Sequence, residues 1–535
     1  MVSLAVVLVV VIFFGAIRYR LRGMPLERDE GEYAYAGQLL LQGVPPYRIA
    51  YNLKLPGIYA AYAAMLAVFG DTPAGIHLGL LLINAATSIL LYFLASRLFG
   101  RLAGVAAALC YSVLSTSGSV MGYEAHATNF VVLPAILSIL LLLHALDSGR
   151  AWLFAASGLL SGIAFLMKQH GIFLAAFCFF YLVSTELRQS KEIRNLARDS
   201  ACFAAGAILP YAATCGLLYR AGVFPKFWFW TVSYAAEYSK MGLRRAIRDF
   251  LENFAGVISP VYWVWILAVA GITAPWWSAS ARKHARFLFG FLTFSFLALC
   301  PGAYFRPHYF ILLLPAAAIL VSVAVASAAE RLKALPLRFL SAIPAVVVLV
   351  AVTHAVFQQR QEYFFLTPED VFQDIYDINP FPAAMTVGDY LKKHSPEDAR
   401  IGVLGSEPEI YFYANRHSAT GYLYMYSLIV HQKYTARMRA EMMTELNANR
   451  PDYLVYVDES DSWGVRTGPP DTEAFLAALH EFMDSQYEKI GVAEIDDTTT
   501  YVWGDGAKGY VPHSTDAMYV LKRRGTAGAP GASPR

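Results

Sequence analysis

Charged residues are scarce in this chain of 535 residues, where Asp, Glu, Lys and Arg together make up 16% of the positions. Hydrophobic residues make up 57% and the mean hydropathy is +0.43, which is more apolar surface than a soluble protein could bury. The formal net charge of +3 is too small to indicate a nucleic-acid partner. The composition therefore predicts a polytopic membrane protein that does not bind nucleic acid.

Cysteine is also rare, with five residues in or beside apolar segments and no CxxC pair. The sequence has no HExxH or comparable metal spacing, no P-loop and no GxGxxG at a strand-to-helix turn. The sequence therefore does not indicate a disulfide framework, a thiolate metal site or a nucleotide-binding site. A cluster of carboxylates could still recruit a divalent cation, so we expect no certain cofactor and no protein-built metal site, and we leave a divalent cation open.

Eleven apolar windows are long enough to cross roughly 30 Å of hydrocarbon as helices. They are residues 1–17, 74–96, 102–120, 128–146, 151–167, 170–184, 201–219, 256–275, 286–302, 307–327 and 337–357. A further apolar segment at 55–70 is short and is bounded by Pro56-Gly57 and Gly70-Asp71. We expect this segment to lie in the outer interface or to dip in and return, because a short segment need not cross the bilayer.

The loops of one side are short and basic, which is typical of the cytoplasmic side of a membrane. These loops are 97–101, 147–150, 185–200, 276–285 and 328–336. The extracytoplasmic side then receives 18–73, 121–127, 168–170, 220–255, 303–306 and everything after 357. Arg18, Arg20 and Arg22 favour the opposite placement of 18–54, which we set aside because the polar motifs of the outer loops make chemical sense only together.

The composition changes abruptly after residue 357, where polar residues replace the apolar runs. We expect a transmembrane domain at 1–357, an extracytoplasmic soluble domain at 358–523 and a disordered tail at 524–535. In the soluble domain, Arg400–Leu404 and Tyr453–Val457 read as buried strands, and 383–394, 431–449 and 471–484 have helical spacing. This pattern predicts a small α/β or α+β module.

Five polar clusters recur at span ends on the expected outer face. They are Asp29-Glu30-Gly31-Glu32, Asn52-Leu53-Lys54-Leu55-Pro56, Tyr123-Glu124-Ala125-His126, Lys168-Gln169-His170 and Tyr304-Phe305-Arg306-Pro307-His308-Tyr309. Charges beside a bilayer are costly unless they face water or a functional site. Together the clusters supply carboxylates for acid–base chemistry and cations that could hold a phosphate.

Each cluster taken alone has a simpler interpretation. A lysine at a span end, such as Lys54 or Lys168, commonly snorkels to the lipid headgroups. Glu124 and His126 suit the capping of a helix as well as catalysis. The aromatic run of the 220–255 loop fits an interfacial belt, with an amphipathic helix along a lipid groove as the alternative.

These motifs resemble those of the GT-C superfamily of integral-membrane glycosyltransferases. The chain looks most like bacterial members of glycosyltransferase family 39, which are related to the protein O-mannosyltransferases and the lipid A aminoarabinose transferases. The resemblance rests on Arg28–Tyr35, Asn52–Gly57, Phe305–Tyr309 and their spacing, and it covers roughly residues 1–360. Leu55 stands where the family more usually has proline.

The resemblance implies a GT-C fold of about 11 transmembrane helices with juxtamembrane helices in the first outer loop. It also implies a polyprenyl-phosphate-sugar donor, an acceptor hydroxyl on a glycan, lipid or protein, and inversion at the sugar. The expected location is the cytoplasmic (inner) membrane, with an extracytoplasmic active site. By the same resemblance, Asp29 is the candidate general base and Glu30 is the second member of an acidic pair.

The resemblance assigns Lys54, Arg306 and His308 to the leaving polyprenyl phosphate. It places Glu124, with His126 beside it, where relatives have a second acidic loop, and we add Lys168 and His170 from topology. Two other functions stay open. A transporter or flippase for lipid-linked sugars predicts inverted repeats, which we do not find. A non-catalytic envelope assembly protein leaves the Asp29 cluster unexplained.

Overall fold

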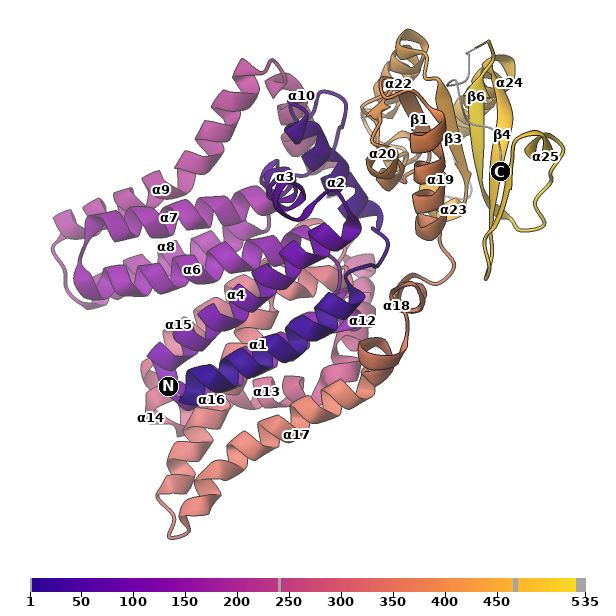
Figure 1. Ribbon diagram of the computed structural model, residues 1–535. Coiled ribbons are helices and arrows are strands. Elements are labelled where there is room, and N and C mark those ends of the chain that lie inside the picture. The colour runs from indigo at the N-terminus through magenta and orange to yellow at the C-terminus, as the bar shows by residue number, and fades with distance from the viewer. Residues whose placement is uncertain (1, 239–241, 465–469, 526–535) are drawn as a thin grey trace.

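A bundle of long helices and a C-terminal domain built on a β-sheet make up the computed structural model, which describes residues 2–238, 242–464 and 470–525 (Figure 1). The helices of the bundle are α1 (Val2–Leu21), α2 (Arg28–Leu41), α3 (Gly57–Phe69), α4 (Pro73–Phe99), α5 (Arg101–Thr116), α6 (Ala127–Ser148), α7 (Ala151–Met167), α8 (Gly171–Arg188), α9 (Ile193–Arg220), α10 (Phe224–Trp228), α11 (Ala235–Tyr238), α12 (Leu243–Ile258), α13 (Tyr262–Trp277), α14 (Ala279–Lys283), α15 (Ala285–Leu297), α16 (Leu314–Lys333) and α17 (Ile343–Gln358). Short helical turns include η2 (Phe229–Tyr234), η5 (Pro307–Leu312) and η7 (Gln361–Phe365).

Each of the eleven apolar windows lies on a helix. Among the described residues, eight helices are long and apolar enough to cross a membrane. The windows at 102–120, 151–167 and 286–302 fall on the shorter apolar helices α5, α7 and α15. The sequence therefore predicted where the helices of the bundle lie, which supports an integral membrane protein.

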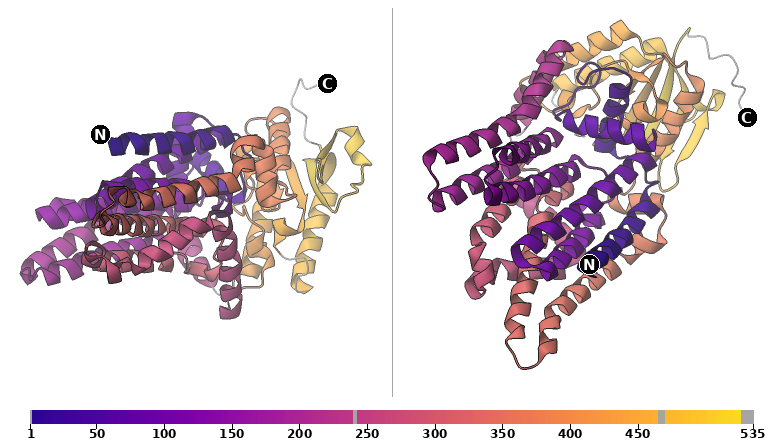
Figure 2. Two further views of the ribbon diagram at one scale, coloured as in Figure 1. Left: turned by 90° about the horizontal axis from the view of Figure 1, so that it is seen from below. Right: turned by 60° about the vertical axis from the view of Figure 1, so that its left-hand side comes forward.

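The short basic loops gather at the end of the bundle that is distant from the C-terminal domain. The start of α1, helix α14 and the turn between α16 and α17 all lie at that end (Figures 1 and 2). Arg97 bonds to Asp147, which joins the loops at 97–101 and 147–150. Arg286 donates to the carbonyl of Ser184 at 3.0 Å, which joins 276–285 to the end of α8. The expected grouping of the basic loops is thus present in the fold.

Helix α3 does not cross the bundle. Lys54, just before α3, lines a cavity beside the C-terminal domain. Asp71, just after it, accepts a hydrogen bond of 2.9 Å from Gln38, whose amide also reaches the carbonyl of Phe412 in the C-terminal domain at 3.4 Å. Both ends of α3 therefore lie at the same end of the bundle, as expected for a juxtamembrane helix.

The described residues of the C-terminal domain form a six-stranded mixed sheet. Its strands are β1 (Arg400–Leu404), β2 (His417–Ser418), β3 (Tyr453–Asp458), β4 (Tyr487–Ile495), β5 (Thr500–Trp503) and β6 (Asp516–Arg523), in the order β2-β1-β3-β6-β4-β5. Its helices are α18 (Pro368–Tyr376), α19 (Phe381–His394), α20 (Glu409–Ala414), α21 (Tyr426–Ile429), α22 (Thr435–Asn449), α23 (Ser460–Trp463), α24 (Pro470–Gln486) and α25 (Asp505–Lys508). Strand β1 is parallel to β2 and β3, whereas β6 is antiparallel to both of its neighbours.

The two strands and three helices that the sequence indicated in this domain are present as β1, β3, α19, α22 and α24. The antiparallel strands β4 and β6 carry a mixture of polar and apolar residues and were not predicted. Residues 526–535 of the expected disordered tail lie outside the described residues.

The C-terminal domain packs on the first turns of α2. Gly31 faces Glu409 so closely that a Cβ at Gly31 would lie 2.5 Å from the Cβ of Glu409. Arg28 forms an ion pair of 2.9 Å with Glu407 and donates to the carbonyl of Ser406 at 2.6 Å. The backbone N–H of Tyr51 donates to the carbonyl of Gly421 at 2.6 Å. These contacts hold the domain over the polar clusters of the bundle.

Candidate active site

The acidic stretch forms the first turn of α2. Glu27 caps the helix, and its two carboxylate oxygens accept the backbone N–H groups of Asp29 and Glu30, each at 2.8 Å. Acidic side chains in a first turn are favoured by the helix dipole. Asp29, Glu32 and Tyr33 are three and four residues apart, so they share one face of the helix.

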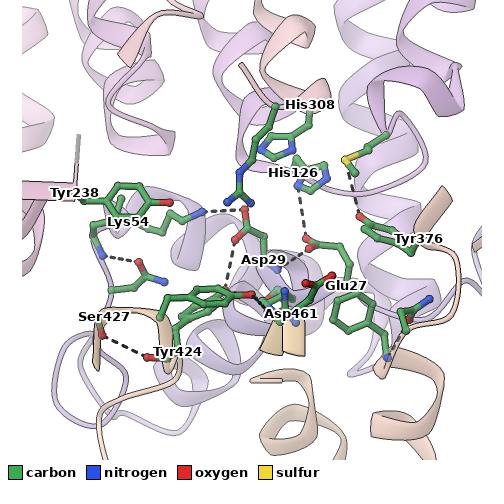
Figure 3. Close-up of a pocket in the computed structure, with 18 of the residues that line it drawn as sticks. Glu27, Asp29, Lys54, His126, Tyr238, His308, Tyr376, Tyr424, Ser427 and Asp461 are labelled. Atoms are coloured by element: carbon green, nitrogen blue, oxygen red, sulfur yellow. Dashed lines mark hydrogen bonds and ion pairs between the residues drawn. The ribbon is translucent and has the colours of Figure 1, made fainter. Parts of the chain in front are cut away.

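A cavity of about 300 Å³ lies where this turn meets the C-terminal domain (Figure 3). Five of the residues predicted from sequence line it, namely Asp29, Lys54, His126, Arg306 and His308. The described part of its wall does not include Glu30, Glu124, Lys168 or His170. The structure therefore brings together residues from four of the five polar clusters.

Asp29 and Lys54 form the central ion pair of the cavity. The Nζ of Lys54 lies 2.9 Å from Oδ2 of Asp29 and 2.9 Å from the hydroxyl of Tyr33. Burial alone would raise the pKa of Asp29, but the charge of Lys54, with His126 and Arg306, holds that pKa well below its usual range. Asp29 is thus ionised at neutral pH and is partly open to the cavity.

Glu30 turns away from the cavity. Its Oε1 accepts the backbone N–H of Ala125 at 2.6 Å and lies 3.1 Å from Nε2 of His77. Its side chain is fully buried among these groups. Glu30 therefore joins α2 to α4 and to the start of α6, whereas Asp29 alone of the predicted acidic pair faces the cavity.

Glu32 is buried directly behind the cavity wall. Its Oε1 accepts the hydroxyl of Tyr59 at 2.5 Å, and its Oε2 accepts the amide of Asn52 at 2.6 Å. The hydroxyl of Tyr424, from the C-terminal domain, also lies 3.1 Å from Oε2. The same hydroxyl is 3.4 Å from Oδ1 of Asp29.

His126 and His308 stack at another part of the wall. Their ring centroids are 3.9 Å apart and their planes differ by 16°. Nε2 of His126 lies 2.9 Å from Glu124, whose carboxylate also accepts the hydroxyl of Tyr376 at 2.8 Å. Burial lowers the pKa of His126 even though Glu27 and Asp29 raise it.

Asp29, His126 and His308 each bring one oxygen or nitrogen atom within 4.8 Å of the others. This group is where the divalent cation that the sequence left open would be sought. Lys54 already pairs with the carboxylate of Asp29, so we assign no metal here.

The chain matches known proteins in two comparisons. Residues 54–212 match the family model described as dolichyl-phosphate-mannose-protein mannosyltransferase. Among solved structures, ArnT from Cupriavidus metallidurans bound to undecaprenyl phosphate has a TM-score of 0.58 at 15% identity, over 97% of each chain. The oligosaccharyltransferase AglB from Archaeoglobus fulgidus, in complex with an inhibitory peptide and a dolichol-phosphate, has a TM-score of 0.52 at 13% identity, over 95% of this chain and 75% of that one. Among curated protein sequences, none matches.

The chain has the GT-C fold. The resemblance that the sequence motifs indicated is confirmed by the family model and by these structures. The structural match to ArnT includes the C-terminal domain, because it covers 97% of this chain.

In this GT-C fold, one of the predicted cationic residues, Arg306, lines the cavity, and another, Lys168, does not. Arg306 is exposed at the wall, with its guanidinium carbon 5.8 Å from the ring centroid of Tyr304. Lys168 is buried behind the wall, with Nζ 4.0 Å from the ring centroid of Tyr309. His170 also packs on Tyr309 and bonds through Nδ1 to the carbonyl of Ala298 at 2.6 Å. Lys168 and His170 thus support Tyr309, which lines the cavity.

The sequence did not indicate several residues of the wall of this GT-C cavity. Glu27 could have been suspected as a helix cap, because an acidic residue precedes the helical stretch. Tyr424 and Tyr426 come from the C-terminal domain, where no motif marked them. Trp230 and Tyr234 also line the cavity, and they belong to the aromatic run for which the sequence favoured an interfacial belt and left a helix along a lipid groove as the alternative.

Proposed function

We propose that this protein is a glycosyltransferase that moves a sugar from a polyprenyl-phosphate donor to an acceptor hydroxyl. The observation that carries the proposal is the Asp29–Lys54 ion pair at the wall of a cavity in a GT-C fold. A carboxylate held ionised beside a cation can accept a proton and is next to a group that can bind phosphate.

Asp29 is the general base of the proposed reaction. The acceptor oxygen attacks the anomeric carbon of the sugar while Asp29 takes its proton. The bond between that carbon and the phosphate oxygen breaks, and the polyprenyl phosphate leaves with the electron pair. Attack from the face opposite the phosphate inverts the anomeric centre. No carboxylic acid is needed for the leaving group, because cations can neutralise a departing phosphate.

Lys54, Arg306 and His308 bind the phosphate in this proposal. Arg306 is suited to the task because its guanidinium is exposed at the cavity wall and can bind two phosphate oxygens at once. The relative that binds undecaprenyl phosphate, ArnT from Cupriavidus metallidurans, supports a lipid phosphate as the ligand. The family model, whose description names a mannosyltransferase using dolichyl phosphate, supports the same class of donor.

The cavity and the C-terminal domain lie on the extracytoplasmic side in this proposal. The grouping of basic loops at the opposite end of the bundle supports that orientation through the positive-inside rule. The acceptor is a hydroxyl of a glycan, a lipid or a protein, and it reaches Asp29 from the space between the bundle and the C-terminal domain.

Mass spectrometry of envelope glycans tests the proposal. Cells with the protein, cells without it and cells carrying Asp29→Asn are compared. We expect one sugar modification to disappear without the protein and to stay absent with Asp29→Asn. The exposed Asp389→Asn on α19 serves as the matched control and should restore the modification. An unchanged glycan profile in cells lacking the protein, or full restoration by Asp29→Asn, would contradict the proposal.

A further inference from the structure

Tyr424 reaches out of the C-terminal domain into the acidic turn of α2 (Figure 3). Its hydroxyl lies 3.1 Å from Oε2 of Glu32, 3.4 Å from Oδ1 of Asp29 and 3.1 Å from the carbonyl of Arg28. A phenol has one proton to donate and can also accept one. The hydroxyl of Tyr424 is therefore placed to donate to one carboxylate, and to accept from the other once that carboxyl group has been protonated.

Glu32 is an additional carboxylate for which the proposed transfer has no use so far. It is buried, and among the described residues its carboxylate oxygens accept hydrogen bonds from Asn52, Tyr59 and Tyr424. Burying a carboxylate costs free energy unless hydrogen bonds or a nearby charge compensate it, or unless the group takes part in proton transfer. Asn52 and Tyr59 satisfy Glu32 from the bundle, so Tyr424 is not needed merely to compensate its charge.

We propose that Tyr424 is a positioning residue that couples Asp29 to Glu32, so that the proton removed from the acceptor passes on to Glu32. This inference rests on the proposed glycosyl transfer. Asp29 first takes the acceptor proton as the new glycosidic bond forms and the bond to phosphate breaks. The hydroxyl of Tyr424 then gives its proton to Glu32 and receives the proton from Asp29. Asp29 is again ionised, Tyr424 is unchanged and Glu32 holds the proton until it returns to solvent.

The charges around the two carboxylates favour transfer in this direction. Burial raises the pKa of Glu32 to about 7, with Asp29 also raising it, although Lys54 and the hydrogen bonds from Tyr59 and Tyr424 lower it. The pKa of Asp29 is held well below its usual range by Lys54, His126 and Arg306. Glu32 is thus the stronger base of the two, and a proton that reaches Asp29 lowers its free energy by moving to Glu32.

Glu27 and Tyr47 are further titratable groups that face this region, and their titration has to be separated from that of Glu32 by experiment. Glu27 lines the cavity beside Asp29, and burial raises its pKa to about 8. The hydroxyl of Tyr47 is buried near Glu32, where it donates to the carbonyl of Lys54 at 2.6 Å. Tyr47 stays protonated, because burial and Glu32 raise its pKa well above the usual value. Glu27 is therefore a nearby carboxyl whose titration overlaps that of Glu32.

The first test needs no substrate. Infrared spectra of the purified full-length protein are recorded from about pH 5 to about pH 9, a range that brackets the expected titration of Glu32. The carboxyl band that Glu32→Gln removes is assigned to Glu32, which separates it from Glu27. We expect this band to titrate near pH 7 and to move to higher pH in Tyr424→Phe, because the lost hydrogen bond favoured the ionised form.

Tyr453→Phe is the matched control for this spectrum. It removes a phenol of the same domain that donates to the carbonyl of His394 at 2.9 Å, away from the cavity. The band should be unchanged in this variant. A band of Glu32 that titrates identically in Tyr424→Phe and wild type would overturn the coupling, as would the absence of any titrating band that Glu32→Gln removes.

The second test is kinetic and uses a polyprenyl-phosphate [³H]mannose with envelope membranes as the acceptor source. We expect Tyr424→Phe to lower kcat by roughly 10-fold, with little change in the KM for the donor, because the loss affects proton transfer rather than phosphate binding. Equal kcat in Tyr424→Phe and an active wild type would overturn this inference alone. A wild type inactive with every donor and acceptor tried would count against the proposed function, while the infrared titration would still decide the coupling.

Discussion

Arg28 and Glu407 form an ion pair of 2.9 Å that joins the first turn of α2 to the C-terminal domain. Glu407 is fully buried, and its other carboxylate oxygen accepts the hydroxyl of Ser462 at 2.7 Å. Arg28 lies next to Asp29 in sequence, so the pair fixes the C-terminal domain one residue away from the proposed base. The position of the domain and the geometry of the cavity are therefore coupled.

Glu407→Gln tests that coupling. Removing one partner of a buried ion pair leaves the charge of Arg28 uncompensated, so we expect the folded state to lose about 3 kcal/mol of stability. Thermal unfolding of the purified protein measures this loss. Glu397→Gln, at an exposed position of the same domain, is the control and should unfold as wild type does. An unchanged unfolding temperature in Glu407→Gln would show that the pair does not hold the domains together.

Lys54→Met should change the pH dependence of transfer. The charge of Lys54 lowers the pKa of both Asp29 and Glu32, so its removal raises both values. The carboxylates are then protonated at higher pH, and the loss of activity on the acidic side begins at higher pH than in wild type. The pH profile of kcat measures the shift. A lower kcat at every pH, with an unchanged pH dependence, would mean that Lys54 binds the donor without shifting the pKa values of the carboxylates.

Arg306→Ala should weaken donor binding. A charge-assisted hydrogen bond to phosphate contributes about 1.5–3 kcal/mol, so we expect the Kd for undecaprenyl phosphate to rise roughly 10- to 100-fold. Binding to the purified protein is measured by calorimetry. Arg150→Ala is the matched control, since Arg150 is exposed between α6 and α7. Equal affinity in the two variants would remove Arg306 from the phosphate site.

A cysteine at Asp71 tests the placement of α3. In a protein without accessible native cysteines, Asp71→Cys should react with a membrane-impermeant thiol reagent from the same side as Glu397→Cys in the C-terminal domain. Arg150→Cys should react only from the opposite side, because it marks the basic end of the bundle. Labelling of Asp71→Cys together with Arg150→Cys would show that the segment at 55–70 crosses the membrane.

The convergence of the polar clusters could be predicted from sequence, because each follows or precedes an apolar span and the alternation of loops fixes their side. The direction in which each side chain points could not be predicted in this way. Asp29 and Glu30 are neighbours in sequence, but successive residues of a helix point about 100° apart. Glu30 consequently faces His77 and Ala125 behind the cavity, while Asp29 faces into it.

Tyr424 could not be found from sequence for a different reason. It meets Asp29 across 395 positions of the chain, and only the docking of the C-terminal domain brings the two together. Its neighbourhood is apolar and aromatic, without a charged pair or a spacing that marks a site. Helices and the two buried strands β1 and β3 follow from local patterns, whereas contacts between domains depend on surfaces that form only after each part has folded.

The close approach of Gly31 to Glu409 has a consequence for the size of the cavity. Position 31 has no side chain, so the C-terminal domain sits on the backbone of α2 itself. Even one methyl group at position 31 would push the C-terminal domain away from α2 and would widen the cavity beside Asp29. In the proposed reaction, the space for the acceptor would thus depend on Gly31, which does not itself line the cavity.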